Sequence, residues 1–482
     1  MLIEDLYRAP WHESVMEVIK QMANQGMSLD EFLIMEITDW EKSDKYKQMV
    51  EGGNYYRHKM DIDKKERKLK VIDQSNQKLK HNFVKKLVDQ KIGYLLSNEP
   101  TIGTRVKEYT EMLNERFDYN LLKKLKSAGR EAINKGIAYL HPYIDEEGNL
   151  QFKRYNSEEI IPFWRDIEEN FAESFIRVYQ EERIINKQKK KVKCVEYHYS
   201  EGIQYYTLEL NQLKPDDLKG IEQRFHFTID DKPYLWERIP LIPIRYNEYE
   251  EPLIVSIKSL VDNYNAQTST HADLLLDIPN VIMKLRNYGG TDLTQFLQEL
   301  ARYRVVKLDD DGDLESLKND VATDSIEKEL DRERKAIYEF GRGVDTTENE
   351  NLGNASGVAL KFRYTDLDLD CNDFENEFQA SLEQIFWFIS HYILITTGKD
   401  YTEEPVNFTF NRAVIINENE KITMAKDSIG ILDDQTIREN HPWYHDGVEE
   451  RLKQQQQEEM DLLDNYETTF NKLNGGGANG QE

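Results

Sequence analysis

The chain has 482 residues, of which 39% are hydrophobic and 32% charged, and its net charge at pH 7 is -27. A chain of this length can bury the cores of two or three domains, which excludes a single small module. The excess of acidic residues also excludes DNA binding through a broadly basic face, because that mode depends on neutralising phosphates.

The sequence predicts neither export nor a membrane span. Residues Met1 to His12 contain no apolar core of signal-peptide length, so we do not expect secretion by that route. The longest apolar stretch, Phe386 to Ile395, has about half of the roughly 20 residues that a membrane span requires. Cys194 and Cys371 lie far apart in the chain, which indicates ordinary thiols rather than a disulfide framework or a cysteine-based zinc site.

The first part of the chain, up to about Ile244, combines helical and strand patterns. Apolar residues recur near a helical period from Val71 to Ser97, which predicts one long amphipathic helix. The segment Gly136 to Phe152 predicts a β-hairpin, because its apolar residues flank the turn sequence Asp145 to Gly148.

Two further strands are predicted, at Ser174 to Glu182 and at Lys193 to Leu210. The basic run Lys187 to Lys193 lies between them. It is either a nucleic-acid patch or a solvated hairpin tip, and we favour the tip because no aromatic residue interleaves with the lysines.

A pair of prolines, Pro240 and Pro243, marks a boundary, because two prolines cannot both lie inside a paired strand or a helix. One helix is predicted from Ile254 toward Leu274, and a second from Asp324 to Gly341 with a capping box at its start. Each helix carries an apolar stripe that needs a partner surface, and we expect neighbouring copies of the chain to supply it. The stripes consist of Ile254, Ile257 and Val261 in the first helix, and of Ile326, Leu330, Ile337 and Phe340 in the second.

A compact insertion, Asn280 to Thr323, separates these two helices. It is predicted to hold a short helix at Leu293 to Tyr303, a strand at Val305 to Leu308, a turn at Asp309 to Gly312, and a returning strand near Leu314.

The C-terminal part begins with a polar loop, residues 343 to 355. A helix capped by Ser356 should follow and continue to about Ile395, with an interruption at Asp366 to Asp370. Beyond it we expect a strand at Val406 to Ile416, helices from about Asp434 to Leu473, and a disordered glycine-rich tail from Gly475.

Three acidic or histidine-containing groups have metal-binding alternatives. Asp366, Asp368, Asp370 and Glu377 have the spacing of a calcium loop, but Cys371 stands where the sharp turn needs glycine, so we favour exposed carboxylates. A hairpin turn explains Asp309, Asp311, Asp313 and Glu315 more simply than a cation site. His441 to Asp446 is interpreted as a proline-containing helix junction in which Trp443 packs.

No catalytic, cofactor-binding or metal site is predicted. The Gly398-Lys399 pair lacks the glycine and hydroxyl residues of a phosphate-binding loop, and Ser356 lacks the spacing of a nucleophile elbow. We therefore expect no enzyme and no cofactor.

The order of the predicted elements resembles the portal proteins of siphophages, the head-to-tail connectors of tailed bacteriophages. Local segments similar to that family are Trp40-Glu-Lys-Ser43 with Tyr46, Gly53, Tyr55 and Tyr56; Asn76 and Asn82 leading to Leu87-Val-Asp-Gln-Lys91 and Tyr94-Leu-Leu-Ser97; and Asn354-Ala-Ser-Gly-Val-Ala-Leu-Lys361. The resemblance covers nearly the whole chain and rests on the order and spacing of these segments.

The resemblance implies a mainly helical α+β portal fold. Its expected parts are a wing (1–247), a first stem helix (248–279), a small α/β clip (280–323), a second stem helix (324–342), a tunnel loop (343–355), a kinked tunnel helix (356–398), a short crown with C-terminal helices (399–474) and a disordered tail (475–482).

The resemblance also implies a dodecameric ring at one capsid vertex of the virion, assembled in the host bacterial cytoplasm, through which double-stranded DNA passes non-specifically during packaging and ejection. The implied partners are a terminase packaging motor, a head-completion adaptor and tail proteins, scaffold protein and the major capsid protein, without a membrane. The residues expected to face DNA are Arg342, Asp345, Thr346, Thr347, Glu348, Asn349, Glu350, Asn351 and Asn354, and those expected to dock partners at the clip are Asp309, Asp310, Asp311 and Asp313.

Two other classes of function stay open at this point. One is a cytoplasmic helical scaffold that carries a binding head on its two-helix stalk. The other is a nuclease that uses Asp366, Asp368 and Asp370 with a divalent metal. A closed ring of large mass would favour a portal protein over the cytoplasmic scaffold, and metal-dependent DNA cleavage would favour the nuclease.

Overall fold

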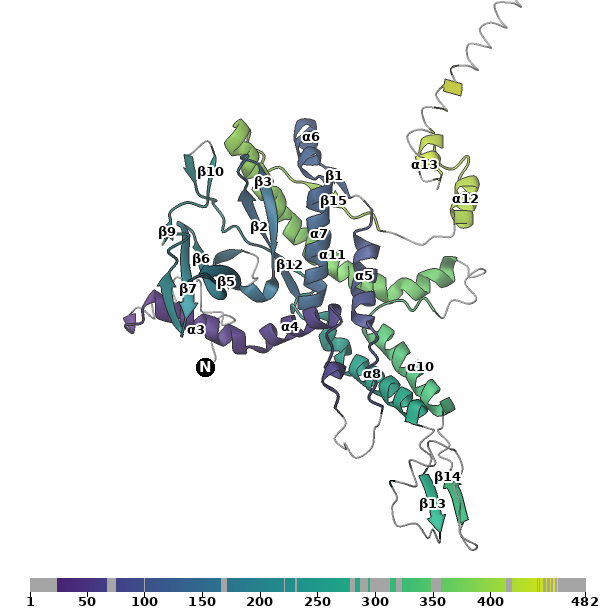
Figure 1. Cartoon of the computed structure of the whole chain (residues 1–482). Coiled ribbons are helices and arrows are strands. Elements are labelled where there is room, and N and C mark those ends of the chain that lie inside the picture. Colours follow the sequence, from purple (N-terminus) through teal and green to yellow (C-terminus); the bar gives the residue numbers. More distant parts are fainter. Residues whose placement is uncertain are drawn as a thin grey trace, which may run out of the picture. The chain divides into compact units, whose positions relative to one another are not determined.

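The computed structural model describes residues 24–66, 75–98, 100–165, 171–220, 222–229, 232–277, 282–286, 313–317, 323–347, 357–412 and 418–439, with isolated residues in the remaining stretches (Figure 1). Contacts divide the chain into one unit of residues 1–347 and 364–413, and another of residues 348–363 and 414–482. The first unit combines long helices with several sheets, so the predicted α+β class is confirmed.

Most helices in the first third of the chain begin at a capping side chain. Ser28 and Glu31 form a capping box at the start of the first of them, and Ser43 both ends that helix and caps the next. Their bounds are α3 Leu29–Lys42, α4 Asp44–Tyr56, the 3-10 helix η1 Asp61–Lys64, α5 Phe83–Leu95, α6 Lys107–Arg116 and α7 Tyr119–Lys135.

The predicted helix from Val71 to Ser97 is wrong in its first part. The helix α5 starts at Phe83, where the Asn82 side chain caps it by accepting a hydrogen bond from the Lys85 amide at 3.1 Å. Residues 75–82 before it are not helical, because their backbone groups bond to another helix instead. Residues 67–74 lie outside the described part of the chain.

The largest sheet has the strand order β4-β5-β6-β7-β8, with β9 also paired to β7. Helix α3 packs its apolar face against this sheet, where the rings of Phe32 and Phe163 contact each other in a tilted arrangement with 5.8 Å between their centroids. The strands are β4 Ile160–Trp164, β5 Ala172–Ile185, β6 Gln188–Tyr199, β7 Gly202–Glu209, β8 Gln212–Pro215 and β9 Glu222–Gln223.

In this sheet one sequence prediction is wrong and another is confirmed. The single strand expected at Lys193 to Leu210 is a pair, β6 and β7, joined by a tight turn. The basic run lies at the solvated tip of the β5-β6 hairpin, as predicted: Asn186 and Lys187 form the turn with positive φ angles of 53° and 61°, and Lys189 to Lys191 are exposed residues at the start of β6, paired to β5.

A three-stranded sheet of order β12-β2-β3 contains the predicted hairpin, with β2 Ile137–Ile144, β3 Leu150–Tyr155 and β12 Ile242–Arg245. Pro243 lies within β12 opposite Tyr139, which is tolerated because β12 is an edge strand. The remaining strand pairs of the body are β10 Phe227–Ile229 with β11 Lys232–Tyr234, and β1 Thr101–Gly103 with β15 Asn407–Thr409. The last strand is shorter than the predicted Val406 to Ile416.

Both predicted stalk helices are confirmed, as α8 Leu253–Asp277 and α10 Thr323–Phe340, which lie side by side (Figure 1). Between them in sequence, β13 Ile282–Arg286 pairs antiparallel with β14 Asp313–Leu317. The predicted returning strand near Leu314 is therefore present, and its partner is β13. The other elements predicted for the insertion lie almost wholly outside the described residues.

Helix α11, Gly357–Thr397, runs for 41 residues without the interruption predicted at Asp366 to Asp370. The reason is a buried stripe at helical spacing, Leu367, Cys371, Phe374 and Phe378, which continues through the acidic run. In the second unit, α12 Glu418–Asp427 was not predicted, and α13 Asp434–Glu439 is the described part of the predicted C-terminal helices. The predicted tail lies outside the described residues.

Candidate functional site where α8, α10 and α11 meet

The apolar stripes of α8 and α10 are used inside the chain. Ile254, Ile257 and Val261 are at most 1% exposed, and Ile337 is fully buried in the same core. This corrects the expectation that neighbouring copies cover these four residues. Ile326 and Leu330 are partly exposed, and Phe340 is 59% exposed.

Beyond Val261, α8 presents a buried polar row to the segment Ser75–Asn82, which we call the strap. The row consists of Asn265, Ser269 and Asp273, all with 0% exposure. The backbone amides of His81, Leu79 and Gln77 donate to these three side chains, in that order, at 2.8, 2.9 and 2.6 Å. The strap is thus bonded to the helix through its main chain.

Ion pairs extend this polar face of α8 in both directions. Lys258 binds Asp61 at 2.6 Å and Asp262 at 2.7 Å, and Lys65 binds the buried Asp273 at 2.8 Å. The hydrogen bond from Lys258 lowers the pKa of Asp61 to about 2. The Asp61 carboxylate is therefore charged at neutral pH and stays paired with Lys258.

The contact between α8 and α10 also has a polar centre. Glu333 of α10 is buried and accepts hydrogen bonds from Asn263 and, at 3.2 Å, from Gln267. Burial raises the pKa of Glu333 above its ordinary value, since the charged form is poorly solvated there.

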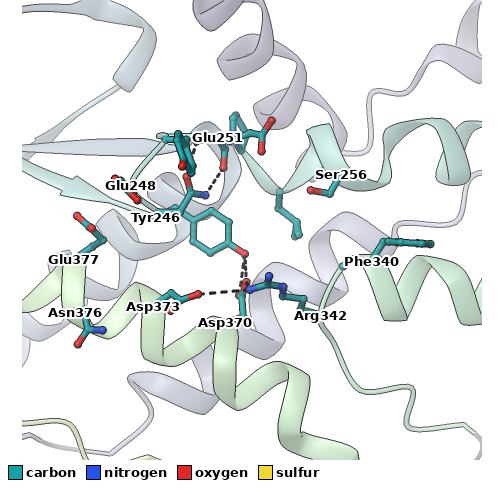
Figure 2. Close-up of a pocket in the computed structure, with 15 residues that line it drawn as sticks. Tyr246, Glu248, Glu251, Ser256, Phe340, Arg342, Asp370, Asp373, Asn376 and Glu377 are labelled. Atoms are coloured by element: carbon teal, nitrogen blue, oxygen red, sulfur yellow. Dashed lines mark hydrogen bonds and ion pairs between the residues drawn. The ribbon is translucent and has the colours of Figure 1, made fainter. Parts of the chain in front are cut away.

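The end of α10 meets α5 and α11 at a buried charged cluster, of which Figure 2 shows Tyr246, Arg342, Asp370 and Asp373. The ammonium of Lys91, 1% exposed, donates to the Asp370 carboxylate at 2.7 Å and to the Arg342 carbonyl at 3.0 Å. The Tyr246 hydroxyl donates to the same carboxylate at 2.9 Å, and burial raises its pKa well above the usual value. The Arg342 guanidinium lies 3.8 Å from Asp370 and 3.6 Å from Asp373.

A hollow of about 470 Å³ opens beside this cluster. Exposed Tyr249 and Phe340 and several carboxylates line it together with Arg342 (Figure 2). Within the described part of the chain, no group of three or more histidine, cysteine or carboxylate side chains is placed to hold a metal ion.

The first residues of the predicted tunnel loop are tied down. Arg334 binds Asp345 through two hydrogen bonds of 2.7 and 2.9 Å and also contacts Thr347. The Gln90 side chain pairs with the amide and carbonyl of Val344 at 2.9 and 3.0 Å, and Lys86 donates to Thr346 at 3.3 Å.

These contacts fix Asp345, Thr346 and Thr347, whereas Arg342 contacts Lys91, Asp370 and Asp373 of the buried charged cluster. The other predicted loop residues, Glu348 to Asn351 and Asn354, lie outside the described residues. So do the predicted clip residues Asp309 to Asp311, whereas Asp313 lies in β14 opposite Arg286.

The calcium-loop alternative loses its geometry. Asp366, Asp368 and Asp370 lie in one continuous helix, so they do not form a calcium loop. Asp370 belongs to the buried cluster, and Asp368 accepts from Tyr94 at 2.5 Å and from Arg412 at 3.3 Å. Trp443, which was expected to pack, is 66% exposed. Cys194 and Cys371 are buried free thiols.

The strap and Lys91 were not predicted as functional features. The row Asn265, Ser269 and Asp273 carries one local signal, its four-residue spacing, which places the three side chains on one face of α8. Lys91 carries no such signal, since its partners Arg342 and Asp370 are about 250 residues or more away in sequence.

In the described residues, no helix combines the length and apolar character that crossing a membrane requires.

Comparisons with known proteins agree with the resemblance. A family model described as "Phage portal protein, SPP1 Gp6-like" matches residues 38–462. The portal protein of Bacillus phage SPP1 is 28% identical over 471 residues, which cover 94% of this chain and 92% of that protein. The portal protein of Clostridium phage phiCD119 is 30% identical over 429 residues, covering 84% and 91%. This chain therefore belongs to the SPP1 Gp6-like family of phage portal proteins.

Proposed function

We propose that twelve copies of this chain form the ring through which double-stranded DNA enters the capsid during packaging and leaves it at ejection. The single observation that carries this function is the family match over residues 38–462. Proteins of this family are structural rather than enzymatic, and they act at the capsid vertex of the virion as oligomeric rings in contact with capsid and packaging proteins.

The charge of the chain supports passage without tight binding. Twelve copies at -27 each carry about -324 formal charges before counterions. Such a ring repels DNA from much of its surface, which confines a polyanion without the binding energy that would stall each step of translocation.

The expected parts of a portal can be assigned to the elements of the chain. We assign the wing to residues 1–247, the stem to α8 and α10, the clip to residues 280–323 and the crown to the C-terminal helices after residue 399. The side-by-side packing of α8 and α10, with β13 and β14 between them in sequence, supports the stem and clip assignments.

The DNA-contacting part of the tunnel loop is proposed to begin after Thr347. Asp345 is engaged by Arg334, and Val344 by Gln90, so these residues anchor the loop to α10 and α5. Contact with DNA is then assigned to Glu348, Asn349, Glu350, Asn351 and Asn354, whose acidic and amide side chains would make a weak, sliding contact.

The partners are proposed from the portal role. The terminase motor, and later the head-completion adaptor and tail proteins, would dock at the clip around Asp309 to Asp313. Scaffold and major capsid proteins would contact the ring during assembly in the host cytoplasm.

Two measurements test this function. Mass photometry of the purified protein should find a closed assembly near 684 kDa, from twelve subunits of 57.0 kDa. Deleting Glu348 to Asn351 should leave rings and empty capsids intact but reduce DNA filling or retention. The control is Glu146→Ala with Glu147→Ala, two exposed acidic residues in the turn between β2 and β3. Monomers alone would reject the ring, and full DNA retention in the deletion would reject the role of the loop.

A further inference from the structure

The strap Ser75–Asn82 and the α8 row Asn265, Ser269 and Asp273 form one continuous contact. We propose that the hydrogen bonds of this contact set the direction of the outer half of α8, and that DNA packaging requires these hydrogen bonds to be formed. The inference rests on the proposed role of α8 as a stem helix.

The two partners match because their repeats are nearly equal. Residues four apart on an α-helix are separated by about 6 Å along the axis. Alternate residues of an extended chain are separated by about 6.6 Å. The amides of Gln77, Leu79 and His81 can therefore meet acceptors at three positions of α8 that are spaced four residues apart. The strap runs antiparallel to α8.

The contact depends on polar groups rather than on apolar packing. Leu79, in the middle of the strap, is 38% exposed, whereas the three acceptors on α8 are fully buried. Each amide has a side-chain acceptor in place of water, and water can replace that acceptor when the strap lifts. The strap can thus detach from α8 and bind it again, whereas the apolar core around Val261 cannot separate in this way.

Lysines secure the strap on both sides. Lys65 binds Asp273 at 2.8 Å, which ties the 3-10 helix region to the same acceptor as Gln77. Lys78 donates to the Asp63 carbonyl at 2.6 Å, and Lys80 binds the Asp63 carboxylate at 2.9 Å. The strap therefore joins α8 to the body formed by α4 and η1, beyond the point where the apolar stripe of α8 ends.

The direction of a helix is determined by contacts along its length. Ile254, Ile257 and Val261 hold the first turns of α8 in the core, and the row holds the later turns. Without the row, the outer turns would lose their contact with the strap while keeping that with α10, and the end that leads into the insertion could change direction.

The test compares three pairs of substitutions in the full chain. Ser269→Ala with Asp273→Ala removes two acceptors and the partner of Lys65. Ser269→Thr with Asp273→Asn keeps an acceptor at both positions. Ser259→Ala with Thr270→Ala changes exposed residues of the same helix and serves as the control.

Hydrogen exchange of the Gln77 and Leu79 amides is measured first, on subunits and on assembled rings. The acceptor-removing pair should exchange about tenfold faster or more, while the other two pairs stay within about twofold of the parent. In a packaging reaction with assembled capsids, the acceptor-removing pair should form rings but package several-fold less DNA. The acceptor-keeping pair should recover most of that packaging.

Three results would overturn the proposal. Unchanged exchange in the acceptor-removing pair would show that the row does not fasten the strap. Faster exchange with normal packaging would reject the positioning role. Loss of rings in both that pair and the milder Ser269→Ala variant would assign the row to subunit folding. If the parent itself forms no rings, the proposed portal function fails, while exchange on subunits still decides whether the strap is fastened.

Discussion

The two helices of the proposed stem are held in different ways. Helix α8 is bound along most of its length, first by buried Ile254, Ile257 and Val261 and then by the polar row that ends at Asp273. In α10 the buried residues are Glu333, Ile337 and Tyr338, all in its second half. Its first half, from Thr323 to Arg332, contributes no buried residue.

The difference assigns unequal roles to the two helices. We expect α8 to transmit the position of the body, and α10 to follow α8 through Glu333 and to be fixed at its end by Lys91. The loop that begins at Gly343 continues from α10, so a shift of α10 would reach the loop first.

The largest effect is expected from Val261→Asp, which attacks the apolar attachment of α8. It places a charge at a fully buried position without a partner, so subunit stability should fall by about 4 kcal/mol and rings should be lost. Denaturant unfolding and mass photometry measure both. Val255→Asp is the matched control, because Val255 is 38% exposed on the same helix. Stable rings from Val261→Asp would mean that α8 does not depend on its core contact.

Removing Lys91 should weaken the attachment of α10, and the loss of subunit stability should be nearly as large as in Val261→Asp. Lys91→Ala leaves the Asp370 carboxylate buried with only the more distant Arg342 as a cation, so the expected loss is about 3 kcal/mol. The double variant Lys91→Met with Asp370→Leu should recover more than half of it. Lys85→Ala, an exposed change on the same helix, should cost less than about 0.5 kcal/mol. An equal loss in Lys91→Ala and Lys85→Ala would contradict the cluster's role.

A smaller effect is expected at the root of the loop. Arg334→Ala removes the paired hydrogen bonds to Asp345, which is largely buried, and should cost about 1 kcal/mol. The Thr347 amide, which donates to Asp345 at 3.0 Å, should then exchange faster. Arg332→Ala, whose side chain is 76% exposed, should leave exchange at Thr347 unchanged. Similar exchange in both variants would show that the loop root is held by other contacts.

The smallest effect concerns pH and the polar face of α8. The folded pKa of Asp61 is about 2, below its unfolded value of about 3.9, so the unfolded chain takes up this proton first as pH falls. The stability from the contact with Lys258 is therefore complete above about pH 4 and lost toward pH 2. Because Asp61 is partly exposed, its share should stay below about 1 kcal/mol. Denaturant unfolding at pH 5 and pH 3 should show a steeper loss in the parent than in Asp61→Asn.

Several elements could be predicted from the sequence because their signals are local. The ends of α8 and α10 and the hairpin of β2 and β3 follow from periodicity, turn residues and capping within a few positions. The Asn82 cap that starts α5 is also local, but it was missed because the helical pattern extends back to Val71. The order of these elements was also sufficient to suggest the family that the comparisons then showed.

Long-range contacts were decided only by the tertiary structure. The strap is extended because its amides find acceptors about 190 residues away on α8, which outweighs the helical pattern of its sequence. Helix α11 continues through Asp366 to Asp370 because the core covers Leu367 and Cys371 on its other face. The apolar stripe of α8 packs within the chain, and Lys91 pairs with Asp370, for the same reason. Burial and hydrogen bonding depend on which residues are close in space, and residues far apart in sequence can be close in space.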